Sequence, residues 1–214
     1  NLVITITGTN DVPVASAASN AVNEDAVVTG SVSATDADQA SGLVYSLNGA
    51  APTGLTFNAD GSYSFDAASY DSLATGATQV ITIPYTATDA NNASNSANLV
   101  ITITGSNDGP IASAASNAVN EDATISGSVS ATDADLGETA TLVYTLNGAA
   151  PTGLTFNADG SYSFDASSYD SLVKDATQVL TIPYTATDAQ GVASTANLVI
   201  TITGTNDVPV ASAA

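Results

Sequence analysis

Acidic and amide side chains recur in pairs along the chain, and their oxygens are ligands for hard cations. The pair Asp133-x-Asp135 is followed by the acid Asp188 and preceded by the dipeptide Asn107-Asp108. Ca²⁺ takes about 6–8 such oxygens at roughly 2.3–2.6 Å, whereas Mg²⁺ demands stricter octahedral geometry. Zn²⁺ prefers His and Cys ligands, and the chain contains neither. These residue types therefore predict calcium binding.

The chain consists of two copies of one unit, and the repeat fixes where the acids stand. Asn10-Asp11 recurs 97 residues later at Asn107-Asp108, and that pair recurs 99 residues later at Asn206-Asp207. Long segments repeat with them, for example LNGAAPTGLTFNADGSYSFDA at 47–67 and again at 146–166. The acids are therefore positioned by the repeat.

A salt-adapted surface is the simplest alternative explanation for the acids, and it predicts scattered positions with a fair share of Glu. Eighteen of the 21 acids are Asp, and among the Asp residues only Asp175 lacks a counterpart in the other copy; among the Glu residues only Glu138 does. The predicted calcium ligands are Asn10, Asp11, Glu24, Asp25, Asp36, Asp38, Asp89, Asn107, Asp108, Glu121, Asp122, Asp133, Asp135, Asp188, Asn206 and Asp207.

Some acids are expected to form turns instead of binding metal. Asp and Asn side chains accept hydrogen bonds from the backbone two residues on, which stabilises tight turns at loop ends. The NADG segment at 157–160 lies between two apolar alternating runs, so we expect a hairpin turn there.

The repeat also defines the expected domains. Residues 1–8 match the end of each unit at 98–105 and 197–204, so we expect them to be the last strand of a preceding repeat. Repeat 1 is expected at 9–105 and repeat 2 at 106–204. Residues 205–214 match the start of a unit, so we expect them to begin a following repeat. On this interpretation the chain is a window from a longer array of repeats. The apolar strand at 2–7 should lie extended and partly exposed, or pair with an open edge of another molecule.

Each unit alternates apolar and polar residues with the two-residue period of half-buried strands. Ile125, Gly127, Val129 and Ala131 share one face, and the same pattern continues in later runs of repeat 2. Seven short strands and one helical turn within 166–176 fit an all-β fold of tandem immunoglobulin-like β-sandwiches arranged end to end. The Cys-Trp-Cys centre of antibody domains is absent.

Successive strands are expected to run alternately away from and toward the preceding repeat. This alternation, or strand parity, assigns the acidic loops to the two ends of each sandwich. The incoming end, which receives the preceding linker, should carry Asp133, Asp135, Asp159 and Asp188 in repeat 2. The outgoing end, from which the next linker leaves, should carry Glu24, Asp25, Asp66 and Asp71 in repeat 1. Two carboxylates about 4 Å apart repel by around 4 kcal/mol at an effective dielectric of 20. Such a crowd requires cations.

The net charge of −20, with Lys174 as the only basic residue, excludes several partners. Such a surface repels nucleic acid and anionic lipid, and no stretch approaches the roughly 18 apolar residues of a membrane helix. We therefore expect a chain that is not membrane-embedded, is monomeric, and has neighbouring repeats of the same chain as its partners. Without His or Cys, nucleophilic triads cannot be built. Paired Asp could serve a glycosidase, but no aromatic subsite is evident, so we do not expect an enzyme.

The motifs resemble cadherin repeats. ATDADLGETATLVYTL is similar to the cadherin Asp-x-Asp segment, TATDA to its later acidic position, SNDGP to its Asn-Asp linker, and NEDA to the Glu supplied by the preceding domain. FNADGSYSFDA, YTATDAQG and ITITGTNDVP resemble the bacterial cadherin-like units called VCBS repeats more closely. The linker is one residue shorter than in cadherins, and Gly105 replaces its first acid.

This resemblance implies a location and a set of ligands. It implies that Asn107, Asp108, Asp133, Asp135 and Asp188 bind Ca²⁺ together with Glu24 of the preceding repeat. VCBS repeats fill the extender regions of giant RTX adhesins of Gram-negative bacteria, such as a marine ice-binding adhesin. The resemblance therefore implies type I secretion and an extracellular position at the bacterial cell surface.

Two functions compete at this point. The first is a calcium-rigidified structural extender that projects a distal binding domain of a large surface adhesin from the cell. The second is a carbohydrate- or cell-binding adhesive module. A binding tip should differ between units, whereas the Tyr and Phe residues are copied in both. The sequence therefore favours the extender.

Overall fold

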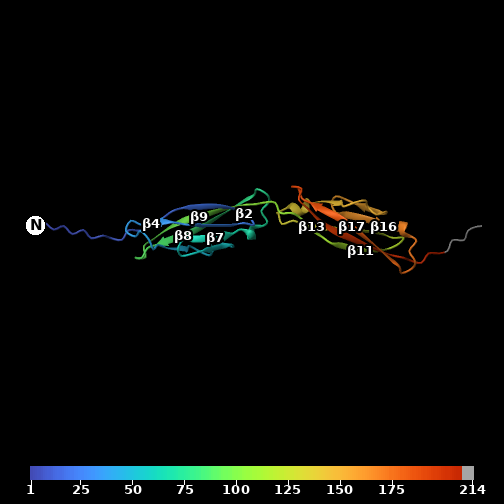
Figure 1. Cartoon of the computed structure of the whole chain (residues 1–214), viewed down its shortest axis with the longest axis horizontal. Coiled ribbons are helices and arrows are strands. Elements are labelled where there is room, and N and C mark those ends of the chain that lie inside the picture. Colours follow the sequence, from blue (N-terminus) through green and yellow to red (C-terminus); the bar gives the residue numbers. More distant parts are fainter. Residues whose placement is uncertain (209–214) are drawn as a thin grey trace, which may run out of the picture. The chain divides into compact units, whose positions relative to one another are not determined.

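The computed structural model describes residues 1–208 and forms two compact units, residues 1–106 and the residues from 107 onward. Each unit is a β-sandwich (Figure 1), which confirms the predicted all-β fold with two domains in tandem. Of the segment expected to begin a following repeat, residues 209–214 lie outside the described part of the chain.

Unit 1 contains nine strand segments and one 3₁₀ turn within the described residues. They are β1 (Val14–Ala15), β2 (Ala18–Asn23), β3 (Val27–Ser31), β4 (Ala34–Thr35), β5 (Val44–Leu47), β6 (Leu55–Phe57), β7 (Ser62–Asp66), η1 (Ala68–Tyr70), β8 (Thr78–Thr88) and β9 (Ser94–Thr104).

Unit 2 repeats this order and adds a 3₁₀ turn, η2, between its fourth and fifth strand segments. Its elements are β10 (Ile111–Ser113), β11 (Ala115–Asn120), β12 (Thr124–Ser128), β13 (Ser130–Thr132), η2 (Glu138–Ala140), β14 (Val143–Leu146), β15 (Leu154–Phe156), β16 (Ser161–Asp165), η3 (Ser167–Tyr169), β17 (Thr177–Thr187) and β18 (Ala193–Thr203).

Each sandwich is formed by a four-stranded and a three-stranded sheet, which in unit 2 have the orders β11-β18-β17-β14 and β12-β16-β15. The single strand predicted near 110–119 is divided, because its two halves join different partners. β10 pairs antiparallel with β13, whereas β11 pairs parallel with β18. Unit 1 has the same arrangement, with orders β2-β9-β8-β5 and β3-β7-β6. Seven strands per unit are thus present, two of them interrupted.

The core lies between the two sheets, as the two-residue alternation predicted. Leu198, Ile200 and Ile202 of β18 are fully buried, and they pack in one cluster with Phe164 and Tyr184. Full burial of such a side chain contributes about 1.5–3 kcal/mol. The equivalent residues of unit 1 form a separate core, so each unit has the apolar centre expected of an independent domain.

A buried tyrosine closes the sandwich at the point where the first strand changes sheets. The Tyr184 hydroxyl lies within hydrogen-bond distance of the carbonyl oxygens of Ser113 and Ser130, the latter at 3.0 Å, and its one proton is shared between them. Tyr85 contacts Ser16 and Ser33 in the same way in unit 1. Burial raises the pKa of both phenols. The hydroxyl thereby satisfies carbonyl groups at the two strand interruptions.

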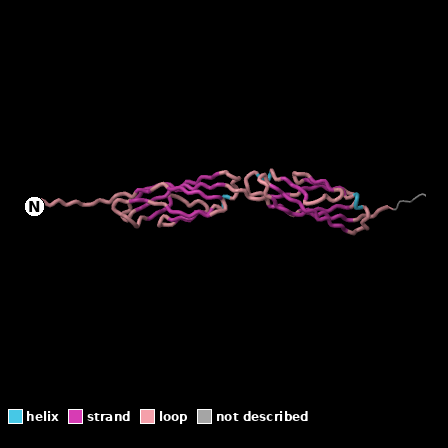
Figure 2. Tube along the Cα trace, turned by 45° about the horizontal axis from the view of Figure 1, so that its top comes forward, coloured by secondary structure: helices cyan, strands magenta, loops and turns pink. Residues whose placement is uncertain are grey.

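The predicted turns are also present. NADG at 157–160 connects β15 to β16, and Gly160 has φ +84°, a left-handed conformation that favours glycine. Figure 2 shows each unit as strand and loop with short helical turns, and η3 falls within the expected 166–176. Among residues 1–208 no helix is long and apolar enough to cross a membrane.

The octapeptide NLVITITG occurs three times, at 1–8, 98–105 and 197–204, in two different environments. The first copy forms no strand and does not pack inside unit 1, and Leu2 is 88% exposed. Leu99 and Leu198, at the same place in the later copies, are fully buried. The first copy thus lies in the exposed state that we expected.

Candidate metal centre

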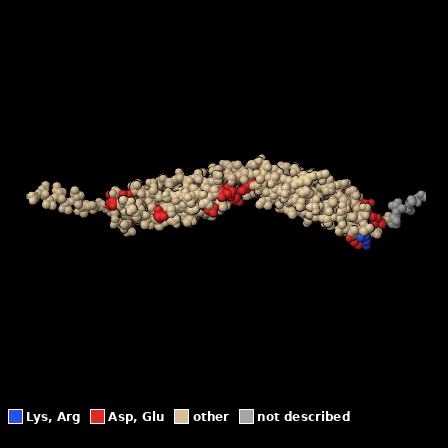
Figure 3. Space-filling view, viewed as in Figure 1, with Lys and Arg blue, Asp and Glu red and all other residues tan. Residues whose placement is uncertain are grey.

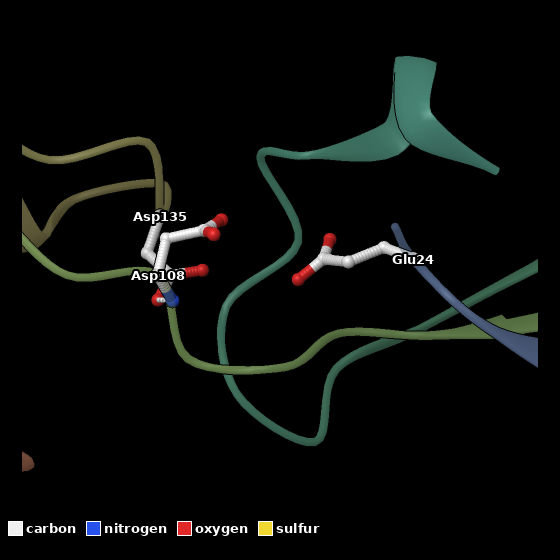
Figure 4. Close-up of side chains that lie close together, drawn as sticks. All are labelled: Glu24, Asp108 and Asp135. Carbon is white, nitrogen blue, oxygen red and sulfur yellow. Dashed lines mark hydrogen bonds between the residues drawn. The ribbon is translucent and has the colours of Figure 1, made fainter. Parts of the chain in front are cut away.

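The incoming end of unit 2 brings five predicted ligands together. Asp133 and Asp135 follow β13, Asp188 follows β17, and Asn107 and Asp108 belong to the linker. The Asn107 side-chain amide donates to Asp188 Oδ2 at 2.9 Å. The Asp108 N–H donates to Asp135 Oδ2 at 3.2 Å, and Figure 4 shows these last two residues. The Asp135 N–H in turn donates to Asp133 Oδ1 at 3.0 Å. The linker is thereby attached to both acidic loops.

These carboxylates are unusually enclosed for charged groups. Asp135 is 2% exposed and Asp188 is 7% exposed. Asp135 Oδ1 and Asp133 Oδ2 are buried oxygen atoms without a hydrogen-bond donor. A buried carboxylate oxygen without a partner costs free energy unless a cation or an ordered water approaches it. The arrangement therefore leaves oxygen atoms suited to coordinating a hard cation.

The linker amide also favours the charged form of its acidic partner. The hydrogen bond from Asn107 holds the pKa of Asp188 below its ordinary value, although burial acts in the opposite direction. Asn10 lowers the pKa of Asp89 in the same way. Both carboxyl groups are therefore ionised at neutral pH, which is the state that binds metal.

The incoming end of unit 1 repeats this arrangement with its own residues. Asn10 donates to Asp89 Oδ2 at 2.7 Å, and the Asp11 N–H donates to Asp38 Oδ2 at 3.1 Å. The Asp38 N–H donates to Asp36 Oδ1 at 3.1 Å, and Asp36 Oδ2 is buried without a donor. The same five side-chain roles thus occur twice, once in each unit.

A second group of acids lies at the outgoing end of unit 2. Asp122, Asp170 and Asp207 each offer a carboxylate oxygen, and these atoms lie within 4.8 Å of one another. The negative charge of Asp122 raises the pKa of Asp170, with a smaller contribution from Asp207. Asp122 has φ +58° in the tight turn between β11 and β12. Asp170 was not among the predicted ligands, although it follows η3 at the expected end.

Glu121 at this end is fully buried and fixes the backbone around the acids. Its carboxylate accepts hydrogen bonds from the Leu172 N–H at 3.2 Å and from the Thr205 N–H at 2.6 Å. It therefore ties the loop after η3 to the outgoing linker. Charge-assisted bonds of this kind are stronger than neutral ones.

Glu24 has the same role in unit 1, where it directly follows β2 (Figure 4). It is fully buried and accepts from the Leu73 N–H at 3.2 Å and from the Ser106 N–H at 2.7 Å. The predicted ligands Glu24 and Glu121 thus both hold a linker in place. Asp25, adjacent to Glu24, has φ +57° like its counterpart Asp122.

Not every acid that strand parity assigned to an end joins the acidic groups. Asp159 accepts hydrogen bonds from the Ser161 N–H at 2.9 Å and hydroxyl at 2.6 Å, which closes the NADG turn and lowers the pKa of Asp159. Asp66 accepts from the Ala68 N–H at 3.0 Å at the start of η1. These two acids stabilise local turns.

The charge distribution leaves the acids without basic partners at the incoming ends. Lys174, the only Lys or Arg of the chain, lines a groove with Asp170 and Asp207 at the outgoing end of unit 2. In Figure 3 the visible acidic side chains gather toward the ends of the units, and the sides are mostly uncharged. The donor set is carboxylate and amide oxygen, which fits Ca²⁺ by ligand type.

Fold and acidic ends together define a pair of cadherin-like, immunoglobulin-like repeat domains. Residues 107–204 match the family model of the bacterial cadherin-like domain, and residues 10–102 match that of the bacterial Ig domain. Each of the two family models thus matches one of the two units. No curated protein sequence matches the chain.

Solved structures of cadherins share the tandem arrangement. Mouse cadherin-23 EC22-24 is 25% identical with a TM-score of 0.56, covering 91% of this chain and 65% of that one. Human protocadherin-24 EC1-2 is 18% identical with a TM-score of 0.52, covering 94% and 100%. Drosophila N-cadherin EC1-4 is 20% identical with a TM-score of 0.55, covering 92% and 50%.

The chain spans about half to two-thirds of the length of the first three structures that it matches. At this level of identity the likeness is one of fold. Of the predicted resemblance, the likeness to bacterial cadherin-like and bacterial Ig domains is confirmed by the two family models.

Proposed function

We propose that the chain is a calcium-rigidified spacer in a large bacterial surface adhesin, and that each linker binds Ca²⁺ with ligands from the repeats before and after it. The main supporting observation is the enclosed Asp135 carboxylate, which has an oxygen without a hydrogen-bond donor in a chain with one basic residue. Such a group is stable when a cation neutralises it.

The ligand set follows from comparing equivalent residues of the two repeats. Asp108 bonds to Asp135 of the repeat that follows it, as Asp11 does to Asp38. Asp207, the counterpart of Asp108, lies with Asp122 and Asp170 of the repeat that precedes it. A linker Asp thus contacts an acid of the following repeat in two cases, Asp11 and Asp108, and lies near acids of the preceding repeat in a third case, Asp207. We infer that Asp108 binds calcium together with Asp25 and Glu24 before it and Asp135 after it.

Calcium would limit the motion of each linker. Without an ion the carboxylates repel, and the backbone between two repeats can bend about residues 105–110. With an ion, ligands from both repeats are held at about 2.3–2.6 Å from one centre. The buried Glu24 already holds Ser106 at the start of that linker. Binding only to the folded state also stabilises each repeat by mass action.

The cellular setting is part of the same proposal. Bacterial cadherin-like and Ig domains support an extracellular, adhesion-related repeat. The VCBS-like motifs support the extender region of an RTX adhesin of a Gram-negative bacterium, exported by type I secretion. The near-identity of the two units suits a spacer, and the carboxylates serve cation binding in this proposal and not catalysis.

The carbohydrate- or cell-binding alternative has less support. A shallow groove in unit 1 is lined by residues such as Asn48, Pro52 and Pro84, and none of the described residues around it is aromatic. Sugar sites generally use aromatic faces, so this groove does not favour a lectin. Screening the chain on a glycan array in calcium tests the alternative.

Small-angle X-ray scattering with and without chelator tests the spacer proposal. In calcium the maximum dimension should be long and sharply defined, and in chelator its distribution should broaden. Isothermal titration calorimetry on the same sample should detect calcium binding in the range used by extracellular modules, about 10⁻⁴–10⁻³ M or tighter. Scattering curves that are identical in both conditions would show that the acids are solvated turn residues.

A further inference from the structure

The loop between β13 and β14 distinguishes unit 2 from unit 1. It is two residues longer than its counterpart in unit 1 and contains η2, which begins at Glu138. Gly137 has φ +92°, and the Glu138 N–H donates to the Asp135 carbonyl at 3.1 Å. A side chain at Gly137 would be strained in this conformation. The loop therefore turns back and brings Glu138 to the Asp133-x-Asp135 pair.

Glu138 adds a third carboxylate to that pair. One carboxylate oxygen from each of Asp133, Asp135 and Glu138 lies within 4.8 Å of the other two. Each of the three side chains also has a buried oxygen with no hydrogen-bond donor, namely Asp133 Oδ2, Asp135 Oδ1 and Glu138 Oε2. The Asp135 side chain is almost fully buried, with 2% of the residue's surface exposed. Three neighbouring anions, one of them almost fully buried and each with a buried oxygen that lacks a donor, require a cation.

The other oxygen of Glu138 is fixed by the loop between β17 and β18. The Gln190 side-chain amide donates to Glu138 Oε1 at 2.8 Å. This bond leaves Oε2 for a different partner and limits the rotation of the carboxylate. A ligand held in this way loses less conformational entropy when it coordinates an ion.

In unit 1 the residue that follows Asp38 is the neutral Gln39. Gln39 accepts a hydrogen bond from the Ala90 N–H at 3.0 Å through its amide oxygen. Asn91, the counterpart of Gln190, contacts Asn10 and not the loop after β4. The two loops therefore differ in charge: in unit 2 a Gln holds the carboxylate of Glu138, whereas the shorter loop of unit 1 has no carboxylate beyond Asp36 and Asp38.

We propose that Glu138 is a calcium ligand that gives unit 2 a cation site built from its own Asp133, Asp135 and Glu138. This inference rests on the proposed binding of calcium at the incoming end and adds a ligand that the repeat pattern does not contain. Calcium affinity rises with the number of charged ligands and the rigidity of the site. Unit 2 therefore binds its ion more tightly than unit 1, whose Asp36 and Asp38 lack a third carboxylate.

Calcium titration of the ¹⁵N-labelled 214-residue chain, after chelator treatment, tests this inference site by site. Backbone amide shifts at residues 133–138 should saturate at about tenfold lower calcium than shifts at residues 36–39, in line with the effect of ligand charge count. In Glu138→Gln the shifts at 133–138 should move to the higher concentration. Asp175→Asn, which removes an equal charge at the other unmatched acid, should leave both midpoints unchanged.

Three results would overturn the inference. Equal midpoints for the two loops in the wild-type chain would do so, and so would a Glu138→Gln midpoint equal to the wild type. An equal effect from Asp175→Asn would show that only net charge matters. If no amide near any predicted ligand responds to calcium, the proposed function fails as well, so the two failures are distinguishable. Unchanged amide shifts at Leu198 and Ile200 verify that each variant is folded.

Discussion

The body of each sandwich and its two ends are stabilised in different ways. In the body, β17 and β18 pair over eleven residues and bury an apolar core that is repeated almost without change in unit 1. At the ends, loops gather Asp and Glu side chains, and several of their oxygens lack donors. The body holds together through side chains that avoid water, whereas the ends concentrate charges of one sign.

The body and the ends therefore have different requirements for stability: the body needs apolar burial, and the ends need neutralisation of their carboxylates. Apolar burial depends on the strand partners alone, so it is complete within each unit. Carboxylate crowding depends on a component that the chain does not supply, because there is one Lys against 21 acids. Changes to the body should therefore have the same effect with or without calcium, whereas the effect of changes to the ends should depend on whether calcium is present.

The largest effect is expected in the body. Leu198→Ala should lower the free energy of unfolding of unit 2 by about 2–5 kcal/mol, because a fully buried Leu leaves a cavity. Leu2→Ala removes the same side chain from the exposed copy of the octapeptide and should have no measurable effect. Urea denaturation monitored by far-UV circular dichroism, in chelator and in calcium, measures both. A similar loss in the two variants would contradict the separate environments of the copies.

Removing calcium is expected to have the next largest effect, and to act on the ends. Each site saturated at a hundredfold excess over its Kd adds about 2.7 kcal/mol of stability. Differential scanning calorimetry should show a lower Tm in chelator, restored by adding calcium. A Tm that is independent of calcium would mean that crowded carboxylates are tolerated without an ion.

A double substitution should reproduce most of that loss at one end only. Asp133→Asn with Asp135→Asn removes two predicted ligands and should lower the Tm of unit 2 in calcium. In chelator it should not lower the Tm, because it also removes two of the repelling charges. Asp159→Asn is the matched control, because this acid closes a turn and contacts Ser161. Calorimetry on the three proteins makes the comparison. If Asp159→Asn costs as much as the double substitution, turn formation explains the acids.

The smallest effect is a titration at the outgoing end. In chelator, the pKa of Asp170 should lie above its ordinary value because Asp122 and Asp207 are negatively charged. A raised pKa in the folded state means that ionised Asp170 destabilises the fold, so lowering the pH through that pKa relieves the repulsion. Carbon-detected NMR titration measures the pKa, and Asp122→Asn should lower it. Asp188, whose pKa is lowered by Asn107, provides the opposite sign in the same experiment.

The fold could be predicted because two independent patterns agree. The two-residue alternation identifies the buried face of each strand, and the repeat of about 98 residues defines a unit of sandwich size. Leu198, Ile200 and Ile202 are buried as their spacing requires. The division of the first strand could not be predicted, because the exchange of partners from β13 to β18 depends on how the two sheets close.

The acidic ends could be predicted only to the level of the loop. Strand parity gives the end at which a loop lies but not how far it reaches. Pairing of β12 with β16 stops at Ser128 and Ser161, and β13 continues to Thr132, so the turn that holds Asp159 falls short of the Asp-x-Asp loop. Glu138 was visible as the one unmatched Glu, but its approach to Asp133 depends on the backbone at Gly137.

The parallel pairing of β11 with β18 determines how a sandwich responds to mechanical force. In unit 2 the chain arrives through β10 and β11 and leaves at the end of β18. Tension applied to the two linkers pulls these neighbouring strands in opposite directions along their length. Six residue pairs, from Ala115 with Leu198 to Asn120 with Thr203, then resist together in shear and cannot be unzipped one at a time. Forced unfolding is governed by the unfolding rate. Because these six pairs must break together, each repeat should unfold slowly under tension.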